Sequence, residues 1–225
     1  GWLAQPICSG SARRLRRPWS LVRSVGCGCS YSPRPRCRST ISNCYWRWQE
    51  AIAQLEQALA IKGDYADAWV ELGNIYHDLG KLDGAEQAYR QALHYNPVLE
   101  GVYYNLGNIS QERGAVAEAI QFYRQTLVRN PDFANAYNNL GQAHEAAGNI
   151  AAALRQYQMA VEHNPDLGGA WFNLGTTTES LGQPQRALGA FRRARDLLEG
   201  VAEHQIYADR AQQAIIRLES AVGDN

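Results

Sequence analysis

The sequence lacks most of the patterns that mark an active site or a membrane protein. None of its apolar runs approaches the roughly 20 residues that a membrane-spanning helix needs. It has no G-x-S-x-G motif, no glycine-rich phosphate loop and no isolated pair of carboxylates. No two of its five histidines have metal-ligand spacing on one helix. We therefore expect a chain with no membrane span, no catalytic residues, no metal and no cofactor, and no small-molecule substrate.

Acidic residues and lysine are absent from residues 1–48, and cysteine is absent from all that follows them. That first part carries nine arginines, which are Arg13, Arg14, Arg16, Arg17, Arg23, Arg34, Arg36, Arg38 and Arg47. It also holds all five cysteines, which are Cys8, Cys27, Cys29, Cys37 and Cys44. The remaining 13 of the 22 basic residues and all 22 acidic residues come after Trp48. The later part therefore has the composition of a reduced, mildly acidic cytoplasmic protein.

What the later part does contain is a stretch that recurs every 34 residues. The same types of residue return in register in four successive copies. The aromatic positions are Trp69, Tyr103, Tyr137 and Trp171, and then Tyr89, Tyr123, Tyr157 and Phe191. The small-residue positions are Gly73, Gly107, Gly141 and Gly175, then Gly80, Gly114, Gly148 and Gly182, then Ala85, Ala119, Ala153 and Ala187. Three copies end in Asn-Pro, at Pro97, Pro131 and Pro165.

Each copy has the pattern of two helices. In the first copy, apolar residues from Asp67 to Leu79 recur at intervals of three and four, which predicts an amphipathic helix. Gly80 is expected to end this helix, because glycine adopts the left-handed C-terminal cap at little cost. A second helix follows up to Asn96-Pro97, and Asp132 and Asp166, just after the later prolines, are candidate N-caps. One such pair cannot bury its own apolar face, so the copies must stack.

The period of 34 and these landmarks resemble the tetratricopeptide repeat family. The resemblance implies an all-α fold, an α-solenoid of stacked antiparallel helix pairs with a C-terminal capping helix. The expected segments are 49–65 as the second helix of a truncated repeat, then repeats 66–99, 100–133, 134–167 and 168–200, then the cap 201–221. In the cap, Val201, Ile206, Ala211, Ile215 and Leu218 are expected on the packed side.

Residues 1–48 do not fit the repeat and are predicted to be unstructured. Pro33, Pro35, Arg38 and Ser42 stand where the first helix of the truncated repeat requires aromatic and small residues. The preferred interpretation of this segment is an out-of-frame or fragment sequence. The second interpretation is a genuine disordered tail. An arm that binds nucleic acid, anionic lipid or a metal comes last, because the cysteines lack paired C-x2-C spacing and the repeats are acidic.

The family resemblance also implies that the first helices line a groove that holds peptides. Amides dominate the expected groove positions, and Asn105, Asn139 and Asn173 recur 34 residues apart, each before a Leu-Gly pair. A row of carboxamides can donate to and accept from the backbone of an extended chain. The row resembles the asparagine ladder of the O-linked N-acetylglucosamine transferases. The proposed groove residues are Asn74, Tyr104, Asn105, Asn108, Asn138, Asn139, Gln142, Phe172 and Asn173.

These residues favour a protein-interaction module that binds an extended peptide or a partner protein. The alternative is the recognition module of a larger enzyme, such as a glycosyltransferase, whose catalytic domain lies outside this sequence. A clamp of basic residues on a C-terminal carboxylate is not supported, since the groove positions contain no Lys or Arg. We expect the asparagines to be exposed, and Ala is the better helix former. Their replacement by Ala is therefore expected to leave stability unchanged or slightly raised.

Overall fold

The computed structural model describes residues 38–202 and 204–223, and every regular element within these ranges is an α-helix. The chain divides into two compact units, residues 1–51 and residues 52–225. Of the first unit, the described residues form only the beginning of helix α1 (Arg38–Ile61). Most of the predicted unstructured segment, residues 1–37, lies outside the described residues.

Helix α1 begins earlier than the sequence pattern predicted. The sequence pattern assigns residues 49–65 to the truncated repeat and predicts that residues 1–48 are unstructured. The helix already includes Arg38, so this prediction is wrong for residues 38–48. The last proline before it is Pro35, and neither proline nor glycine occurs again until Gly63. Once a helix is nucleated, each further residue adds a hydrogen bond at little cost, so the turn that ends it is set by the next breaker. Residues 38–48 are therefore helical, although they lack the repeat pattern.

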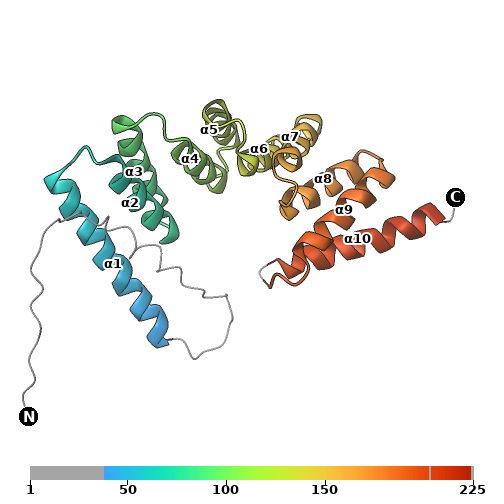
Figure 1. Cartoon of the computed structure of the whole chain (residues 1–225), viewed down its shortest axis with the longest axis horizontal. Coiled ribbons are helices and arrows are strands. Elements are labelled where there is room, and N and C mark those ends of the chain that lie inside the picture. The colour runs from blue at the N-terminus through green and yellow to red at the C-terminus, as the bar shows by residue number, and fades with distance from the viewer. Residues whose placement is uncertain (1–37, 203, 224–225) are drawn as a thin grey trace, which may run out of the picture. The chain divides into compact units, whose positions relative to one another are not determined.

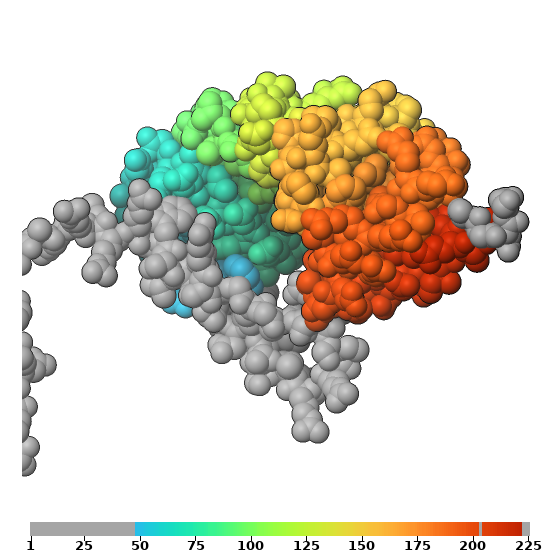
Figure 2. Space-filling model, turned by 45° about the vertical axis from the view of Figure 1, so that its right-hand side comes forward, coloured from blue at the N-terminus to red at the C-terminus, as the bar shows by residue number. Residues whose placement is uncertain are grey.

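The second unit contains the four predicted helix pairs (Figure 1). The pairs are α2 (Ala66–Asp78) with α3 (Leu82–Tyr95), α4 (Glu100–Glu112) with α5 (Val116–Arg129), α6 (Ala134–Ala146) with α7 (Ile150–His163), and α8 (Gly168–Ser180) with α9 (Pro184–Leu198). Within a pair the helices pack on each other, and the second helix of one pair packs on the first helix of the next. Figure 2 shows this stacking on the surface, where the colours that mark residue number follow one another from one repeat to the next. The predicted all-α solenoid is confirmed.

The turns within and between the pairs use two different devices. Within each pair a glycine has positive φ, at 70° for Gly80 and 76° for Gly148, which is the predicted left-handed cap. Between pairs the Asn side chain folds back, so that Asn130 Oδ1 accepts from the backbone N–H of Asp132 at 3.1 Å. The predicted N-caps at Asp132 and Asp166 are wrong. The cap positions belong to Phe133 and Leu167, which make no side-chain cap hydrogen bond.

The core of each pair is an aromatic ring placed beneath a glycine of the partner helix. Tyr89, Tyr123, Tyr157 and Phe191 are at most 1% exposed. A Cβ atom added at Gly73 would come within 2.5 Å of the Tyr89 ring. The absence of a side chain at this glycine therefore lets the second helix bring its aromatic ring directly against the first. In the tyrosine copies, the hydroxyl group reaches a polar side chain of the first helix, which is Asn74 for Tyr89, Asn108 for Tyr123 and Glu145 for Tyr157.

The last helix, α10 (Gln205–Gly223), packs against α9 and also approaches α8. It begins at Gln205 and not at the predicted Val201, because Gly200 adopts a positive φ of 80° and the chain turns there. Val201 and Ile206 were expected on the packed side but are exposed. The buried side is instead formed by Ala208, Ala211, Ala214, Ile215 and Leu218. The opposite side carries exposed polar residues, which are Asp209, Arg210, Gln213, Arg217 and Glu219.

Candidate functional site

The first helices of the repeats line one continuous side of the solenoid. Between successive pairs, α4 approaches α6 and α8 approaches α10, as expected for the inner side of a curved stack. We call the surface formed by the nine predicted groove residues the ladder face. It is defined by Asn74, Tyr104, Asn105, Asn108, Asn138, Asn139, Gln142, Phe172 and Asn173. All nine are half-buried, neither enclosed in the core nor fully exposed.

Asparagine side chains on this face bond from one repeat to the next. Asn105 Nδ2 donates to Asn74 Oδ1 of the preceding repeat at 3.2 Å. Asn139 Nδ2 donates to Asn108 Oδ1 at 3.0 Å in the same way. Asn173 Nδ2 donates to Asn138 Oδ1 at 2.9 Å, so the third link uses a different position of the preceding helix. The three predicted ladder residues therefore join successive repeats.

The core tyrosines complete this network from below. The Tyr89 hydroxyl donates to Asn74 Oδ1 at 2.8 Å and accepts from Asn105 Nδ2 at 3.2 Å. The Tyr123 hydroxyl lies 2.9 Å from both Asn108 Oδ1 and Gln111 Oε1. Burial raises the pKa of both phenols far above the usual value for tyrosine, so they remain neutral donors. Sequence reasoning missed this role, although the tyrosine of the second helix is visible in the repeat pattern.

These bonds correct the expectation that the ladder asparagines are free surface residues. Each is half-buried and makes at least one hydrogen bond across a repeat boundary. An Asn→Ala substitution therefore removes a cross-repeat bond, which costs about 0.5–1.5 kcal/mol per bond. The gain in helix propensity, at most about 0.7 kcal/mol, does not offset the loss of two such bonds.

Some donor and acceptor groups of the ladder asparagines make no hydrogen bond to the described residues. None of the hydrogen bonds among the described residues uses Asn74 Nδ2 or Asn105 Oδ1. The same holds for Asn173 Oδ1. The bonded pair of Asn74 and Asn105 thus retains both a donor group and an acceptor, the two functions that a peptide backbone requires of a partner.

The other predicted groove residues are held by neighbours. The Tyr104 ring lies 5.0 Å from the Phe133 ring, and its hydroxyl accepts from Asn139 Nδ2 at 3.0 Å. Burial raises the pKa of the Tyr104 phenol. The ring of Phe172 lies 5.5 Å from that of Tyr207 on α10, so the last helix reaches the end of the ladder face.

The remaining two are polar. Gln142 Oε1 accepts from Gln111 Nε2 of the preceding repeat at 3.3 Å. Asn138 Nδ2 donates to its neighbour Asn139 Oδ1 at 3.2 Å, in addition to accepting from the next repeat. The hydrogen bonds of the ladder face therefore form two networks of amides and hydroxyls, one between repeats 1 and 2 and one that runs from repeat 2 to repeat 4.

Two of the histidines, His77 and His144, contact other parts of the solenoid. His77 Nε2 lies 2.9 Å from Glu112 Oε1 of the next repeat. His144 is 7% exposed, so it packs within its repeat. Burial, together with the positive charges of Arg124 and Arg155, lowers the pKa of its imidazole. Among the described residues there is no group of three or more side chains that could hold a metal ion, and no helix both long and apolar enough to cross a membrane.

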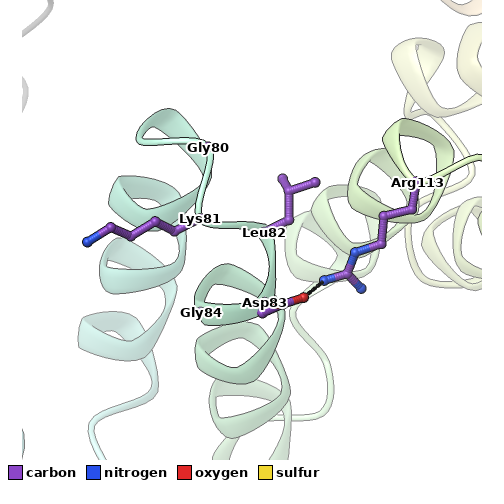
Figure 3. Close-up of a pocket in the computed structure, with 6 residues that line it drawn as sticks. All are labelled: Gly80, Lys81, Leu82, Asp83, Gly84 and Arg113. Carbon is purple, nitrogen blue, oxygen red and sulfur yellow. Dashed lines mark hydrogen bonds and ion pairs between the residues drawn. The ribbon is translucent and has the colours of Figure 1, made fainter.

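A cavity of about 440 Å³ lies away from the ladder face, at the turn between α2 and α3 (Figure 3). It is lined by Gly80, Lys81, Leu82, Asp83, Gly84 and Arg113. Arg113 comes from the next repeat and bonds to Asp83 at 2.5 Å and to Glu86. The Lys81 side chain points away from Arg113 in Figure 3. With its guanidinium already paired, Arg113 binds successive repeats together.

Comparison with known proteins agrees with this architecture. A family model described as "TPR repeat" matches residues 47–80 and 73–114, and one described as "Tetratricopeptide repeat" matches residues 104–167 and 138–202. The chain belongs to the tetratricopeptide repeat family. No curated protein sequence matches it.

Several solved tetratricopeptide and related helical structures are similar in fold. MamA is 22% identical with a TM-score of 0.63, over 69% of this chain and 91% of MamA. YrrB, described as "a TPR protein with an unusual peptide-binding site", is 20% identical with a TM-score of 0.60, over 77% of this chain and 88% of YrrB. The type III secretion chaperone SycD of Yersinia enterocolitica, solved with a peptide of the translocator YopD, is 15% identical with a TM-score of 0.51. That match covers 53% of this chain and 91% of SycD. These likenesses establish the shared fold.

Proposed function

We propose that this tetratricopeptide array is a protein-interaction module that holds an extended peptide segment of a partner along the ladder face. The observation that carries the proposal is the bonded pair of Asn74 and Asn105, which retains an amide N–H donor and a carbonyl acceptor. An extended backbone has the complementary groups, and contact with the backbone does not depend on the side chains of the ligand. The solved structures of YrrB and SycD, whose descriptions refer to peptide binding, support this proposal.

The test must separate binding from stability, because the asparagines also join the repeats. One variant replaces Asn105, Asn139 and Asn173 by Ala. The matched control replaces Tyr89, Tyr123 and Tyr157 by Phe, which removes hydroxyl groups beneath the ladder but leaves every carboxamide in place. Repeat 4 already carries Phe191 at this position, so the ring alone is compatible with the fold.

Both variants should lose stability, since each removes buried or half-buried hydrogen bonds. Only the asparagine variant should also lose binding to a panel of unrelated capped peptides of about 12 residues, measured by titration calorimetry. At about 0.5–1.5 kcal/mol per lost hydrogen bond, Asn105 and Asn173, whose carbonyl oxygens are unbonded, should each account for roughly a two- to twelvefold fall in affinity. An asparagine variant that binds the panel as strongly as the unmodified chain contradicts the proposal.

A further inference from the structure

The two sets of helices in the repeats differ sharply in charge. The first helices, α2, α4, α6 and α8, contain no lysine and no arginine. They carry seven carboxylates, on Asp67, Glu71, Asp78, Glu100, Glu112, Glu145 and Glu179. The second helices carry eight arginines, which are Arg90, Arg124, Arg129, Arg155, Arg186, Arg192, Arg193 and Arg195, against five carboxylates, on Asp83, Glu86, Glu118, Glu162 and Asp196. The side of the solenoid formed by the first helices is therefore acidic.

Some of these carboxylates are already paired. Glu112 lies 2.9 Å from His77 Nε2, and Glu179 lies 2.7 Å from an Arg217 nitrogen on α10. Glu145 accepts from the Tyr157 hydroxyl at 2.8 Å, a neutral donor that leaves its negative charge uncompensated.

Three carboxylates therefore stand out as uncompensated. Asp67, Asp78 and Glu145 are exposed, and no ion pair among the described residues involves them. In α2, Asp67, Asn74 and Asp78 are separated by seven and four residues, which places both acids on the same side of the helix as the ladder asparagine. Burial is the main cause of the raised pKa of the Tyr89 phenol beneath the ladder, and the nearby carboxylates of Asp78 and Glu71 raise it further. In α6, Glu145 follows Gln142 by three residues and shares its side of the helix.

From this distribution of charge around the ladder, we infer that the extended segment held by the ladder face is basic, with Lys or Arg side chains spaced along it. The inference rests on the proposed function and specifies the ligand. The amides would hold the backbone, and the carboxylates would select for positive side chains and repel acidic segments. At about 10 Å between neighbouring first helices and about 3.4 Å per extended residue, the four helices span roughly nine residues.

The test uses the full chain and two capped synthetic peptides of about 12 residues. One alternates Ser with Lys, and the other alternates Ser with Gln, so that length and backbone are the same. The Lys peptide should bind at least about tenfold more tightly at low salt, and raising the salt from about 50 mM to about 300 mM should remove most of that difference. The Gln peptide should be nearly insensitive to salt.

Two sets of isosteric substitutions assign the effect to the ladder face. The first set is Asp67→Asn, Asp78→Asn and Glu145→Gln, where the amide oxygen of the last can still accept from Tyr157. The second set removes the same charge elsewhere, through Glu56→Gln, Glu162→Gln and Glu199→Gln, all exposed. The first set should weaken the Lys peptide by about twofold per site and roughly eightfold together, and the second set by less than twofold.

The outcomes separate this inference from the proposed function. If both sets weaken the Lys peptide equally, the carboxylates of the ladder face are not what selects the basic segment, and the inference is overturned. If the Lys and Gln peptides bind alike, the basic preference itself is overturned. In both cases a backbone-binding face stands. If the Lys peptide binds but the triple asparagine variant binds it undiminished, the proposed hold on the backbone fails. Because the inference rests on that hold, it fails with it.

Discussion

Because the two helices of each repeat approach closely at a glycine, we predict that adding one methyl group at this glycine lowers the stability of the protein. A Cβ atom at Gly107 would lie 2.6 Å from Tyr123 Cε1 and 2.7 Å from Cδ1. Tyr123 is 0% exposed, and its ring packs in a cluster with Ala119, Leu140 and Ala143. Its hydroxyl is held by Asn108, so the ring cannot withdraw without breaking the ladder network.

The Gly107→Ala substitution therefore combines two opposing terms. Overpacking a close-packed core costs about 1–3 kcal/mol, and replacing glycine by alanine in a helix returns about 1 kcal/mol. Because the added Cβ would lie only 2.6 Å from the ring, the overpacking cost should be in the upper part of its range, about 2–3 kcal/mol, which leaves a net loss of about 1–2 kcal/mol. The matched control is Gly189→Ala in α9, where nothing lies within 4 Å of the added Cβ and only the helix-propensity term acts. This control should gain about 0.5–1 kcal/mol.

Urea unfolding followed by far-UV circular dichroism measures both variants. The midpoints should move in opposite directions, and they are the quantity to compare because repeat arrays depart from two-state unfolding. The penalty should also disappear when Gly107→Ala is made in a Tyr123→Leu background, since the clashing ring is gone. If Gly107→Ala shifts the midpoint upward as Gly189→Ala does, the proposed steric role of this glycine is wrong.

Two further predictions concern titration and the joints between repeats. The pKa of His144 is lowered in the folded state, so the unfolded chain binds the proton more readily and stability falls as the pH drops below about 6.5. Between pH of about 7.5 and about 5.5, the urea midpoint of His144→Thr should therefore fall less than that of the unmodified chain. A decline as steep as that of the unmodified chain would contradict this role. Arg113→Met should lose about 0.5–1 kcal/mol at neutral pH, because Arg113 pairs with Glu86 across a repeat boundary. Since Arg113 lowers the pKa of the Glu86 carboxyl, this loss should begin to shrink as the pH falls below about 4.5 and should vanish once the pH passes the lowered value. An unchanged urea midpoint at neutral pH would refute the pairing.

The sequence by itself determined the repeat and its fold class. A recurring Leu-Gly pair, a glycine before the second helix and an Asn-Pro turn are local signals, and each acts within one turn of helix. The positive φ of Gly80 and its equivalents follows from such a signal. The burial of His144 also follows from its place in the repeat, at a position that packs in each copy.

Local signals did not predict the ends of two helices. These ends depend on the lack of a helix-breaking residue or on packing against a neighbouring helix. The start of α1 at Arg38 follows from the lack of a breaker, although the repeat pattern there is lost. The start of α10 at Gln205 depends on a chain reversal at Gly200, and its buried side on packing against α9.

Only the tertiary structure decided the state of the candidate site. The period of 34 places Asn105, Asn139 and Asn173 in a row, but it cannot show which atoms meet. Stacking brings each carboxamide within 2.9–3.2 Å of an asparagine in the preceding repeat. Because those partners lie 31 or 35 residues away, their contact depends on the angle between repeats, which is a property of the packed solenoid and not of any one helix.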